Sequence, residues 1–194
     1  HKLSVSAFDE LTRGSFQCVV NEIDELSPMD VTRVVFCSGK VYFDLLEARR
    51  ADEARNVAIV RIEQLYPFPS ADYAAALAHY PNAREIVWCQ EEPQNQGAWY
   101  QIRHRLQDSL RGNQELLYSG RRPAAAPATG IPQLHSTEQH GLVAAAITAS
   151  TQEQSSRATP RLRARASNTP VITPARAALS VTEEMTFHFG VPSA

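Results

Sequence analysis

Short apolar runs alternate with longer amphipathic segments along the first 150 residues of the chain. The runs are rich in β-branched and aromatic residues, which predicts strands, and the segments between them repeat apolar positions at helical spacing. The predicted strands are 33–37, 57–62, 85–89 and 116–118, and the predicted helices are 41–47, 71–79, 98–110 and 138–147. Because the strand runs are almost wholly apolar, both faces of the sheet should be covered. We therefore expect an α/β fold, an open and mostly parallel sheet with helices on both faces, and an antiparallel sandwich fits poorly.

Two further segments flank this repeating pattern. Residues 4–26 form a lead-in, in which we expect a turn of helix and then a strand over 16–20. From residue 150 the chain is rich in Ser, Thr and Pro and carries four Arg between Arg157 and Arg165. Such a stretch cannot bury enough surface to offset its ordering entropy, so we predict a domain over 1–149 and a disordered tail over 150–194. A tether for an acidic partner or a nucleic acid is the alternative interpretation of the tail.

Composition adds little to the predicted fold, but it argues against several classes of protein. The 194 residues are 43% hydrophobic with a formal net charge of −2, which gives no electrostatic reason to expect binding to nucleic acid or to an anionic membrane. No window approaches a membrane span, and the N-terminus lacks the apolar core of a signal peptide. We expect a soluble, unexported protein and, since the first residue is not Met, a fragment or a processed piece. Cys18, Cys37 and Cys89 are dispersed and odd in number, which is typical of neither a disulfide framework nor a metal cluster and favours a reducing compartment.

In open parallel sheets, ligands bind outside the carboxyl ends of the strands. The first predicted strand is followed by Ser38-Gly39-Lys40, a flexible turn into a helix, and the fourth by Gly120-Arg121-Arg122. A helix start, a Lys and adjacent Arg residues all favour an anion. The alternatives are a helix cap with a solvated Lys at the first position and interdomain ion pairs at the fourth.

The other two strand ends favour assembly over chemistry. Tyr66-Pro67-Phe68-Pro69 follows the second strand, where prolines fix a non-helical exit and aromatic rings need a neighbour to cover them, as at a domain interface. Glu91 and Glu92 follow the third strand, but adjacent residues of an extended segment point in opposite directions, so capping and interchain hydrogen bonds fit better than catalysis. We find none of the common nucleophile, dinucleotide or metal motifs. The residues therefore indicate a regulatory or assembly domain without catalytic or metal-binding residues.

Four long motifs then make the pattern specific. CSGKVYFDL, VAIVRIEQLYPFP, VWCQEEPQNQGAW and YSGRRPAAAPATG closely resemble, in order and spacing, the C-terminal domain of thiamine-diphosphate-dependent 2-oxoglutarate dehydrogenase over about residues 2–148. The resemblance implies a transketolase-type C-terminal fold that closes a homodimer and packs on upstream cofactor-binding domains. It also implies oxidative decarboxylation of 2-oxoglutarate in the citric acid cycle, with succinyl transfer to the lipoyl group of a dihydrolipoyl succinyltransferase partner.

The chain also departs from that family. It contains no Gly-Asp-Gly motif of the kind that binds Mg²⁺ and thiamine diphosphate, and the catalytic upstream segments are missing. We expect a fragment that does not bind this cofactor and is inactive alone. The resemblance further implies effectors such as acetyl-coenzyme A or AMP, with Lys40, Arg121 and Arg122 on the phosphates and Gln90 as a polar neighbour. Ion pairs and caps at a dimer or interdomain contact are the alternative roles of these four residues.

Two other functions remain open at this stage. A free-standing module that binds an acyl-coenzyme A or a nucleotide should lack the broad apolar face, carrying Tyr66, Phe68 and Trp99, that a fragment would expose. A nucleic-acid binder acting through the Arg-rich tail should show strongly salt-dependent affinity. The expected compartment is the bacterial cytoplasm, or the mitochondrial matrix if the source is eukaryotic.

Overall fold

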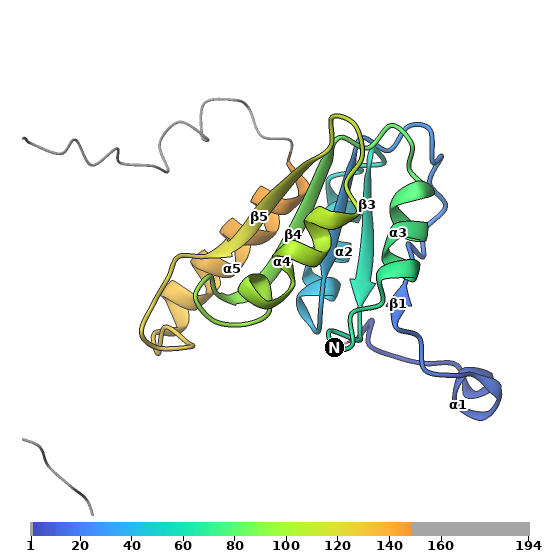
Figure 1. Cartoon of the computed structure of the whole chain (residues 1–194). Helices are drawn as coiled ribbons and strands as arrows, with labels where there is room; N and C mark the ends of the chain where they lie inside the picture. The colour runs from blue at the N-terminus through green and yellow to red at the C-terminus, as the bar shows by residue number, and fades with distance from the viewer. Residues whose placement is uncertain (1, 149–194) are drawn as a thin grey trace, which may run out of the picture. The chain divides into compact units, whose positions relative to one another are not determined.

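The computed structural model describes residues 2–148 and forms ten helices and strands over this range (Figure 1). The predicted tail 150–194 lies outside the described residues, so the boundary at 149 stays a prediction. The helices are α1 Phe8–Arg13, α2 Val41–Ala51, α3 Ser70–Ala78, α4 Trp99–Asp108 and α5 Pro132–Ile147. The strands are β1 Val19–Val20, β2 Arg33–Cys37, β3 Val57–Ile62, β4 Glu85–Pro93 and β5 Glu115–Arg121.

The strands form one open sheet in the order β1-β3-β2-β4-β5. Strands β2, β3, β4 and β5 are parallel to their neighbours, while the two-residue β1 pairs antiparallel with the end of β3. Central strand β2 is buried at all five positions, as its continuous apolar run predicts for a strand covered on both faces. The expected mostly parallel α/β sheet is confirmed.

Helices cover both faces of this sheet, and the side chains of successive strand residues point to opposite faces. Val34 and Phe36 of β2 pack in a core with α3 and α4, whereas Val35 and Cys37 pack in a second core with α2 and α5. Figure 1 shows α3 and α4 in front of the sheet and α2 and α5 behind it. This division matters for the site, because a strand residue faces one helical layer or the other.

Several predicted boundaries were wrong: the strand expected over 16–20 is only Val19–Val20, and α2 runs to Ala51 instead of ending at 47. Strand β4 continues to Pro93 instead of ending at residue 89, and β5 runs over Glu115–Arg121 instead of 116–118. The two strands stay paired, with a register shift between Cys89 and Pro93, so that Pro93 pairs with Arg121. Helix α5 begins at Pro132, where a proline fits the first turn, rather than at 138.

Buried ion pairs fasten the lead-in and the last helix to the sheet. The Arg49 side chain bonds both Glu22 and Asp24, and Glu22 also accepts a hydrogen bond of 2.7 Å from the backbone N–H of Ile59. Arg33 joins Glu85 at 2.8 Å and donates to the carbonyls of Ala145 and Ala146 near the end of α5. Helix α1, by contrast, buries none of its residues. None of the described helices is long and apolar enough to cross a membrane.

Candidate functional site at the carboxyl edge of the sheet

Lys40 stands at the carboxyl end of β2, in the turn that begins α2. Gly39 takes a φ of +75°, which Gly adopts readily, and Lys40 is the residue before the first helical turn. The Lys40 ammonium lies 2.9 Å from Glu91 Oε2 and 3.9 Å from Asp44 Oδ2. The hydrogen bond to Glu91 is the main reason that the pKa of Lys40 is raised. Lys40 is thus ion-paired, yet 63% of its side chain is exposed and remains accessible to an incoming anion.

Arg121 ends β5 on the same face of the sheet and is held by α5. Its side chain is only 6% exposed, and Nη2 lies 2.5 Å from Nδ1 of His135. Because a guanidinium can only donate, Nδ1 of His135 must accept and carries no proton in this arrangement. Arg121 Nε lies 3.4 Å from Glu138 Oε2, but neither of these two buried atoms has a hydrogen-bond partner among the described residues. Arg121 therefore keeps unused hydrogen-bonding capacity at the edge of the sheet.

Arg122 is exposed and lies beside Arg121. Both arginines line a small, partly open cavity of about 210 Å³, together with residues 126–129 and Glu138. Lys40 lies close enough to Arg121 for their positive charges to repel. It lines a neighbouring hollow of about 520 Å³ between α2 and α5, where His135 is also found. The structure thus brings Lys40 and Arg121 close together, while the exposed Arg122 shares the smaller cavity with Arg121.

Gln90, the fourth predicted residue, faces the opposite helical layer and lies inside the protein. Its Oε1 accepts from Trp88 Nε1 at 2.9 Å and from the backbone N–H of Trp99 at 3.0 Å. Its Nε2 donates to the carbonyls of Glu92, Pro93 and Gln96. Gln90 therefore shapes the turn between β4 and α4, and the structure does not bring it together with the cations.

The same turn is tied to the loop that carries Arg122. Asn95 Nδ2 donates to the carbonyl of Ala124 and Asn95 Oδ1 accepts its N–H, both at 2.9 Å, and Gln96 Nε2 adds a bond of 3.0 Å to the same carbonyl. Gly97 has a φ of +64°, and a Cβ there would lie 2.9 Å from Gln90 Nε2. The polar residues of this turn thus bond within the chain, in keeping with the expected capping role, while the expected interchain hydrogen bonds stay a prediction.

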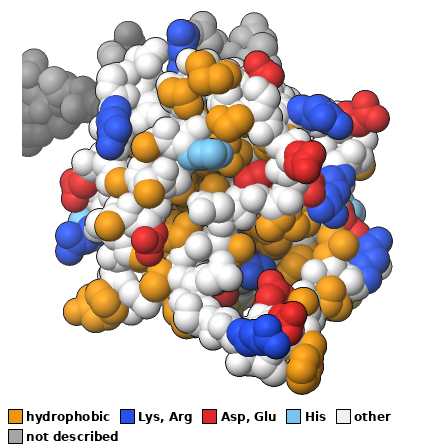
Figure 2. Space-filling view, turned by 90° about the vertical axis from the view of Figure 1, so that its right-hand side faces the viewer, with side chains coloured by type: hydrophobic (Ala, Val, Ile, Leu, Met, Phe, Trp, Pro, Cys, Tyr) orange, Lys and Arg blue, Asp and Glu red, His pale blue; other side chains and the backbone are white. Residues whose placement is uncertain are grey.

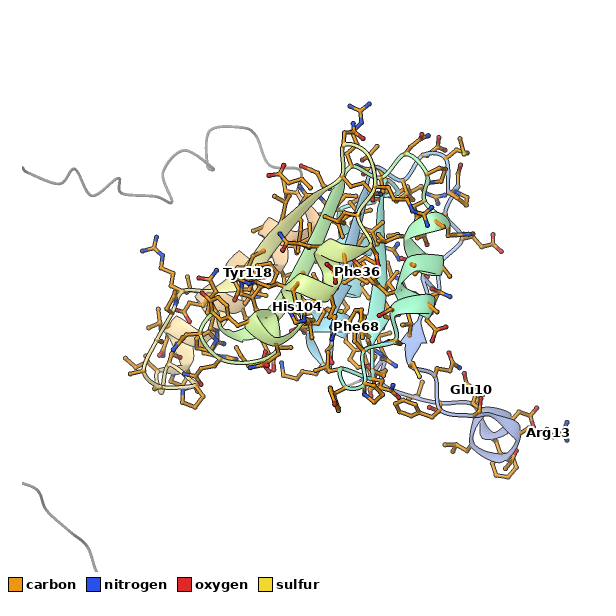
Figure 3. The ribbon with its side chains drawn as sticks, in the orientation of Figure 1. Glu10, Arg13, Phe36, Phe68, His104 and Tyr118 are labelled. Atoms are coloured by element: carbon orange, nitrogen blue, oxygen red, sulfur yellow. The ribbon has the colours of Figure 1, made fainter. Side chains whose placement is uncertain are left out.

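A groove of about 960 Å³ lies on the α3 and α4 side of the same edge, and we call it the edge groove. Its lining is mixed, and includes Leu65, Tyr66, Pro67, Phe68, Trp88, Gln90, Glu92, Ala98, Ile102, His104 and Arg105. Figure 3 shows Phe68 and His104 on this side of the sheet. Tyr66 is 93% exposed and Phe68 half-buried, but the expectation for Trp99 was wrong. Trp99 is buried, because its ring packs 5.0 Å from that of Tyr118.

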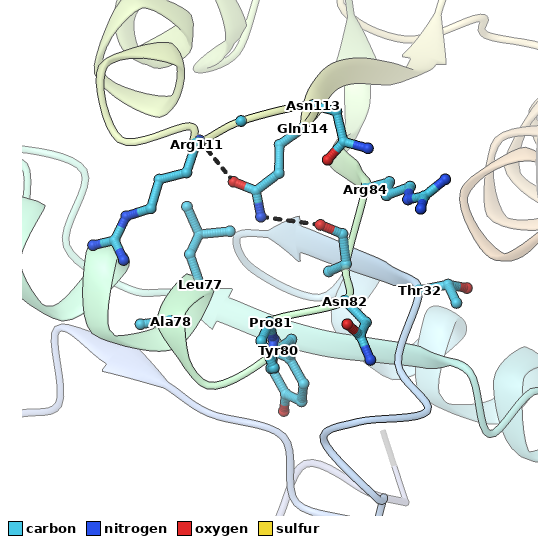
Figure 4. Close-up of a pocket in the computed structure, with 12 residues that line it drawn as sticks. Thr32, Leu77, Ala78, Tyr80, Pro81, Asn82, Arg84, Arg111, Asn113 and Gln114 are labelled. Atoms are coloured by element: carbon cyan, nitrogen blue, oxygen red, sulfur yellow. Dashed lines mark hydrogen bonds between the residues drawn. The ribbon is translucent and has the colours of Figure 1, made fainter.

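Another hollow, of about 690 Å³, lies at the amino ends of β4 and β5 (Figure 4). Gln114 organises it, accepting from the Arg111 N–H at 2.9 Å and donating to the Ala83 carbonyl at 3.0 Å. The side chains of Arg84 and Arg111 point to opposite sides in Figure 4, so they do not converge on one ligand. Within residues 2–148 no group of three or more His, Cys, Asp or Glu could hold a metal ion. The carboxyl edge is the stronger candidate site.

Sequence reasoning missed the contribution of the first half of α5. His135 contacts Arg121, and Gln139 donates to Asp44 Oδ2 at 2.7 Å. Proline before a polar stretch was the available signal for an earlier helix start, since Pro132 fits the first helical position.

The fold and this edge define an open α/β domain with the basic side chains of Lys40, Arg121 and Arg122 at its carboxyl edge. A family model described as 2-oxoglutarate dehydrogenase C-terminal matches residues 5–147, and the chain belongs to this family.

Relatives in three bacteria carry the name 2-oxoglutarate dehydrogenase E1 component. The chain is 54% identical to that of Haemophilus influenzae over 147 residues, 47% to that of Cupriavidus necator over 147, and 48% to that of Coxiella burnetii over 149. Each match covers 76% of this chain but only 16% of the relative. A solved structure described as a split gene transketolase, inactive beta4 tetramer, aligns with a TM-score of 0.44 and 16% identity over 59% of this chain and 37% of that one.

Proposed function

We propose that the chain serves as the C-terminal domain of a 2-oxoglutarate dehydrogenase E1 component and works only within the larger enzyme. The main support for this proposal is the 54% identity to such a component, of which the chain spans 16%. The whole enzyme would decarboxylate 2-oxoglutarate oxidatively in the citric acid cycle. It would then pass the succinyl group to the lipoyl group of a dihydrolipoyl succinyltransferase, in the cytoplasm of a bacterium.

Thiamine diphosphate and Mg²⁺ belong, in this proposal, to the upstream domains. The described residues do not fit them: the carboxylates at the edge face cations or amides of the domain itself, as Glu91 does with Lys40 and Asp44 with Gln139. Moreover, no described cluster of acidic residues could hold the metal ion. No step of the reaction is therefore assigned to this chain.

We propose further that the domain assembles through its carboxyl edge, with the upstream domains of the same enzyme and with a second copy in a homodimer. An exposed ring at Tyr66 beside the partly apolar edge groove supports such a contact, because large exposed apolar patches usually mark interaction sites.

A phosphate-bearing effector such as acetyl-coenzyme A or AMP would bind on the other face of this edge. Lys40, Arg121 and Arg122 would hold its phosphates, and the unpartnered Nε of the buried Arg121 supports this assignment. Gln90 would contribute indirectly, by fixing the turn whose Asn95 holds the Arg122 loop. The same observation supports a second candidate function, a free-standing module that binds an acyl-coenzyme A or a nucleotide.

A hybrid enzyme tests the first proposal. Residues 5–147 would replace the matching segment of the Haemophilus influenzae E1 component, and release of CO₂ from 2-oxoglutarate would be measured. We expect an active hybrid, an inactive truncation without the segment, and no activity from the chain alone with thiamine diphosphate and Mg²⁺. A folded but inactive hybrid would contradict the proposal.

Isothermal titration of the full chain with acetyl-coenzyme A and AMP tests the effector site. The triple variant Lys40→Ala, Arg121→Ala, Arg122→Ala should lose binding, whereas the control pair Arg84→Ala and Arg111→Ala should retain it. Glu91→Gln should bind a few-fold more tightly, because it frees Lys40 from an ion pair of modest strength. Absence of heat from the folded wild-type chain would refute this site and leave an assembly domain.

A further inference from the structure

The sheet has two lateral edges, and the one formed by β3 is covered. Strand β1 pairs with Arg61 and Ile62 of β3, and the outward N–H of Ile59 donates to the Glu22 carboxylate at 2.7 Å. Figure 2 faces this side of the molecule and shows hydrophobic, acidic and basic side chains interspersed over it. The lead-in thus provides partners for the backbone of this edge, which is one way in which proteins protect an edge strand.

Strand β5 forms the other lateral edge, and its outer side has no such partners. Among the described strands β5 pairs with β4 alone, beginning with the N–H of Glu115, which donates to the Arg84 carbonyl at 2.8 Å. Because backbone groups alternate between the two sides of a strand, those of Leu116, Tyr118 and Gly120 point away from β4. Within residues 2–148 these outward N–H and C=O groups form no hydrogen bond. The outer edge of β5 therefore offers a row of backbone donors and acceptors.

The residues of this outer edge do not block the addition of another strand. Natural edge strands are commonly protected by charges or prolines. Between Glu115 and Arg121, however, β5 reads Leu-Leu-Tyr-Ser-Gly and contains neither. The side chains of Leu116, Leu117 and Tyr118 are only half-buried, so part of their apolar surface stays exposed. An extended segment placed along β5 would bond the free backbone groups and cover this surface.

Helix α4 places a positive charge in front of this edge. Figure 1 shows α4 between α3 and β5. The flank of α4 that carries Gln101 and Arg105 lines the edge groove, so the opposite flank, with Tyr100 and Arg103, is turned toward β5. The exposed Arg103 guanidinium lies over the Tyr100 ring at 5.1 Å and has no ion pair within residues 2–148. It is available to a carboxylate on the front face of an added strand.

Helix α5 leaves space behind the same edge. Its flank with Ser136 and Gln139 lines the hollow toward α2. The flank away from α2 carries Gly141 and Ala145, which are both exposed, and a Cβ at Gly141 would meet nothing within 4 Å. The back face of an added strand would thus lie beside small uncharged side chains, which suits apolar residues and offers no partner to a charge.

We propose that the outer edge of β5 binds an extended acidic segment of a partner protein, which joins the sheet with its carboxylates beside Arg103 and its apolar side chains beside Gly141 and Ala145. Because strand side chains alternate between faces, the recognised segment alternates acidic and apolar residues. This surface is separate from the carboxyl edge and the edge groove, so the inference goes beyond the proposed function and does not depend on it.

Fluorescence anisotropy with the full 194-residue chain tests this proposal. The probe is a fluorescein-labelled peptide, Gly-Glu-Val-Glu-Val-Glu-Gly. We expect saturable binding that Arg103→Glu weakens at least about tenfold, because like charges then face each other. Arg105→Glu is the matched control on the other flank of α4 and should bind like wild type. Both side chains are exposed, so thermal unfolding should be the same in the two variants. No binding to the folded wild-type chain, or equal binding by both variants, would overturn the proposal.

Methylation of peptide amides then tests whether the peptide binds as a strand. Alternate residues of an added strand turn their N–H groups toward β5. Of two peptides, one N-methylated at the three glutamates and one at the two valines, one should therefore lose binding and the other should keep it. Loss in both or in neither would refute strand addition. Self-association of the chain in sedimentation equilibrium that the acidic peptide reverses would show that a second copy fills this edge, and would also overturn the proposal.

Discussion

Gln90 offers the sharpest test of how the carboxyl edge is built. Replacing it by Leu keeps a side chain of similar size but removes both polar atoms. Five hydrogen-bond contacts are lost, two accepted by Oε1 and three shared between the two N–H groups of Nε2. The indole N–H of Trp88 and the backbone N–H of Trp99 would lose their acceptor in a buried environment, since Gln90 is only 3% exposed.

The expected cost follows from these contacts. A buried donor left without a partner costs about 1–3 kcal/mol, so two such donors give about 2–6 kcal/mol. The edge groove is open to solvent and lined by Gln90, which allows water to reach one of the stranded groups. The leucine side chain recovers about 1 kcal/mol of apolar burial. The one donor that stays unpartnered costs about 1–3 kcal/mol, so after the gain from leucine we expect the free energy of unfolding to fall by about 1 kcal/mol, and by about 2 kcal/mol at most.

Equilibrium urea unfolding would measure this loss, by circular dichroism and by the emission of Trp88 and Trp99, the two tryptophans of the chain. Gln101→Leu is the control, because Gln101 lines the same groove from an exposed position on α4 and should change stability by less than about 0.5 kcal/mol. Equal stability of the two variants would refute the reasoning and show that water replaces the Gln90 amide.

Three further predictions concern groups buried or paired elsewhere. Arg33→Ala should lower the free energy of unfolding by about 3–5 kcal/mol in chemical denaturation, since it strands a carboxylate and two carbonyls of α5. The hydrogen bond from Arg50 lowers the pKa of Asp24 below 3.8 in the folded protein, so the ionised carboxylate stabilises the fold above that pH. This stabilisation is lost as the pH falls through the lower pKa of the folded state. Asp24→Asn should therefore make the free energy of unfolding depend less steeply on pH in an acid titration. Burial raises the pKa of Cys89 to about 12, so iodoacetamide should label the half-buried Cys18 first, as peptide mapping would show.

The sheet could be predicted from the sequence where burial alone decides the structure. Strands β2 and β3 have the predicted bounds, 33–37 and 57–62, because each run is apolar and bounded by polar turns. The predicted end of β4 was wrong, because the strand continues through Gln90, whose side chain is polar and yet buried. Its hydrogen bonds are what allow this polar side chain to be buried. A pattern of hydrophobic and polar residues cannot show that a polar side chain is buried when its hydrogen-bond partners lie in the turn that follows it.

The candidate site was predictable in position but not in arrangement. The rule for parallel sheets brings Lys40 and Arg121 to the same edge, and the structure agrees. The contact of Arg121 with His135 could not be foreseen, because it needs α5 to begin six residues before the predicted start at 138. The sequence also could not show that Lys40 is paired with Glu91, since this contact joins two strand ends 51 residues apart.

Strand alternation explains why the carboxyl edge carries two different surfaces. Gln90 and Glu91 are consecutive in β4, yet Gln90 faces α4 and fixes the turn beside the edge groove, while Glu91 faces α2 and α5 and holds Lys40. One strand end therefore serves an apolar groove on one face and a cluster of cations on the other. Because the two residues share no partner, changes at Gln90 should affect the shape of the groove, and changes at Glu91 should affect the charge offered to an anion. A change at Glu91 can thus alter the charge without touching the groove, whereas a change at Gln90 also reaches the Arg122 loop through the turn that it fixes.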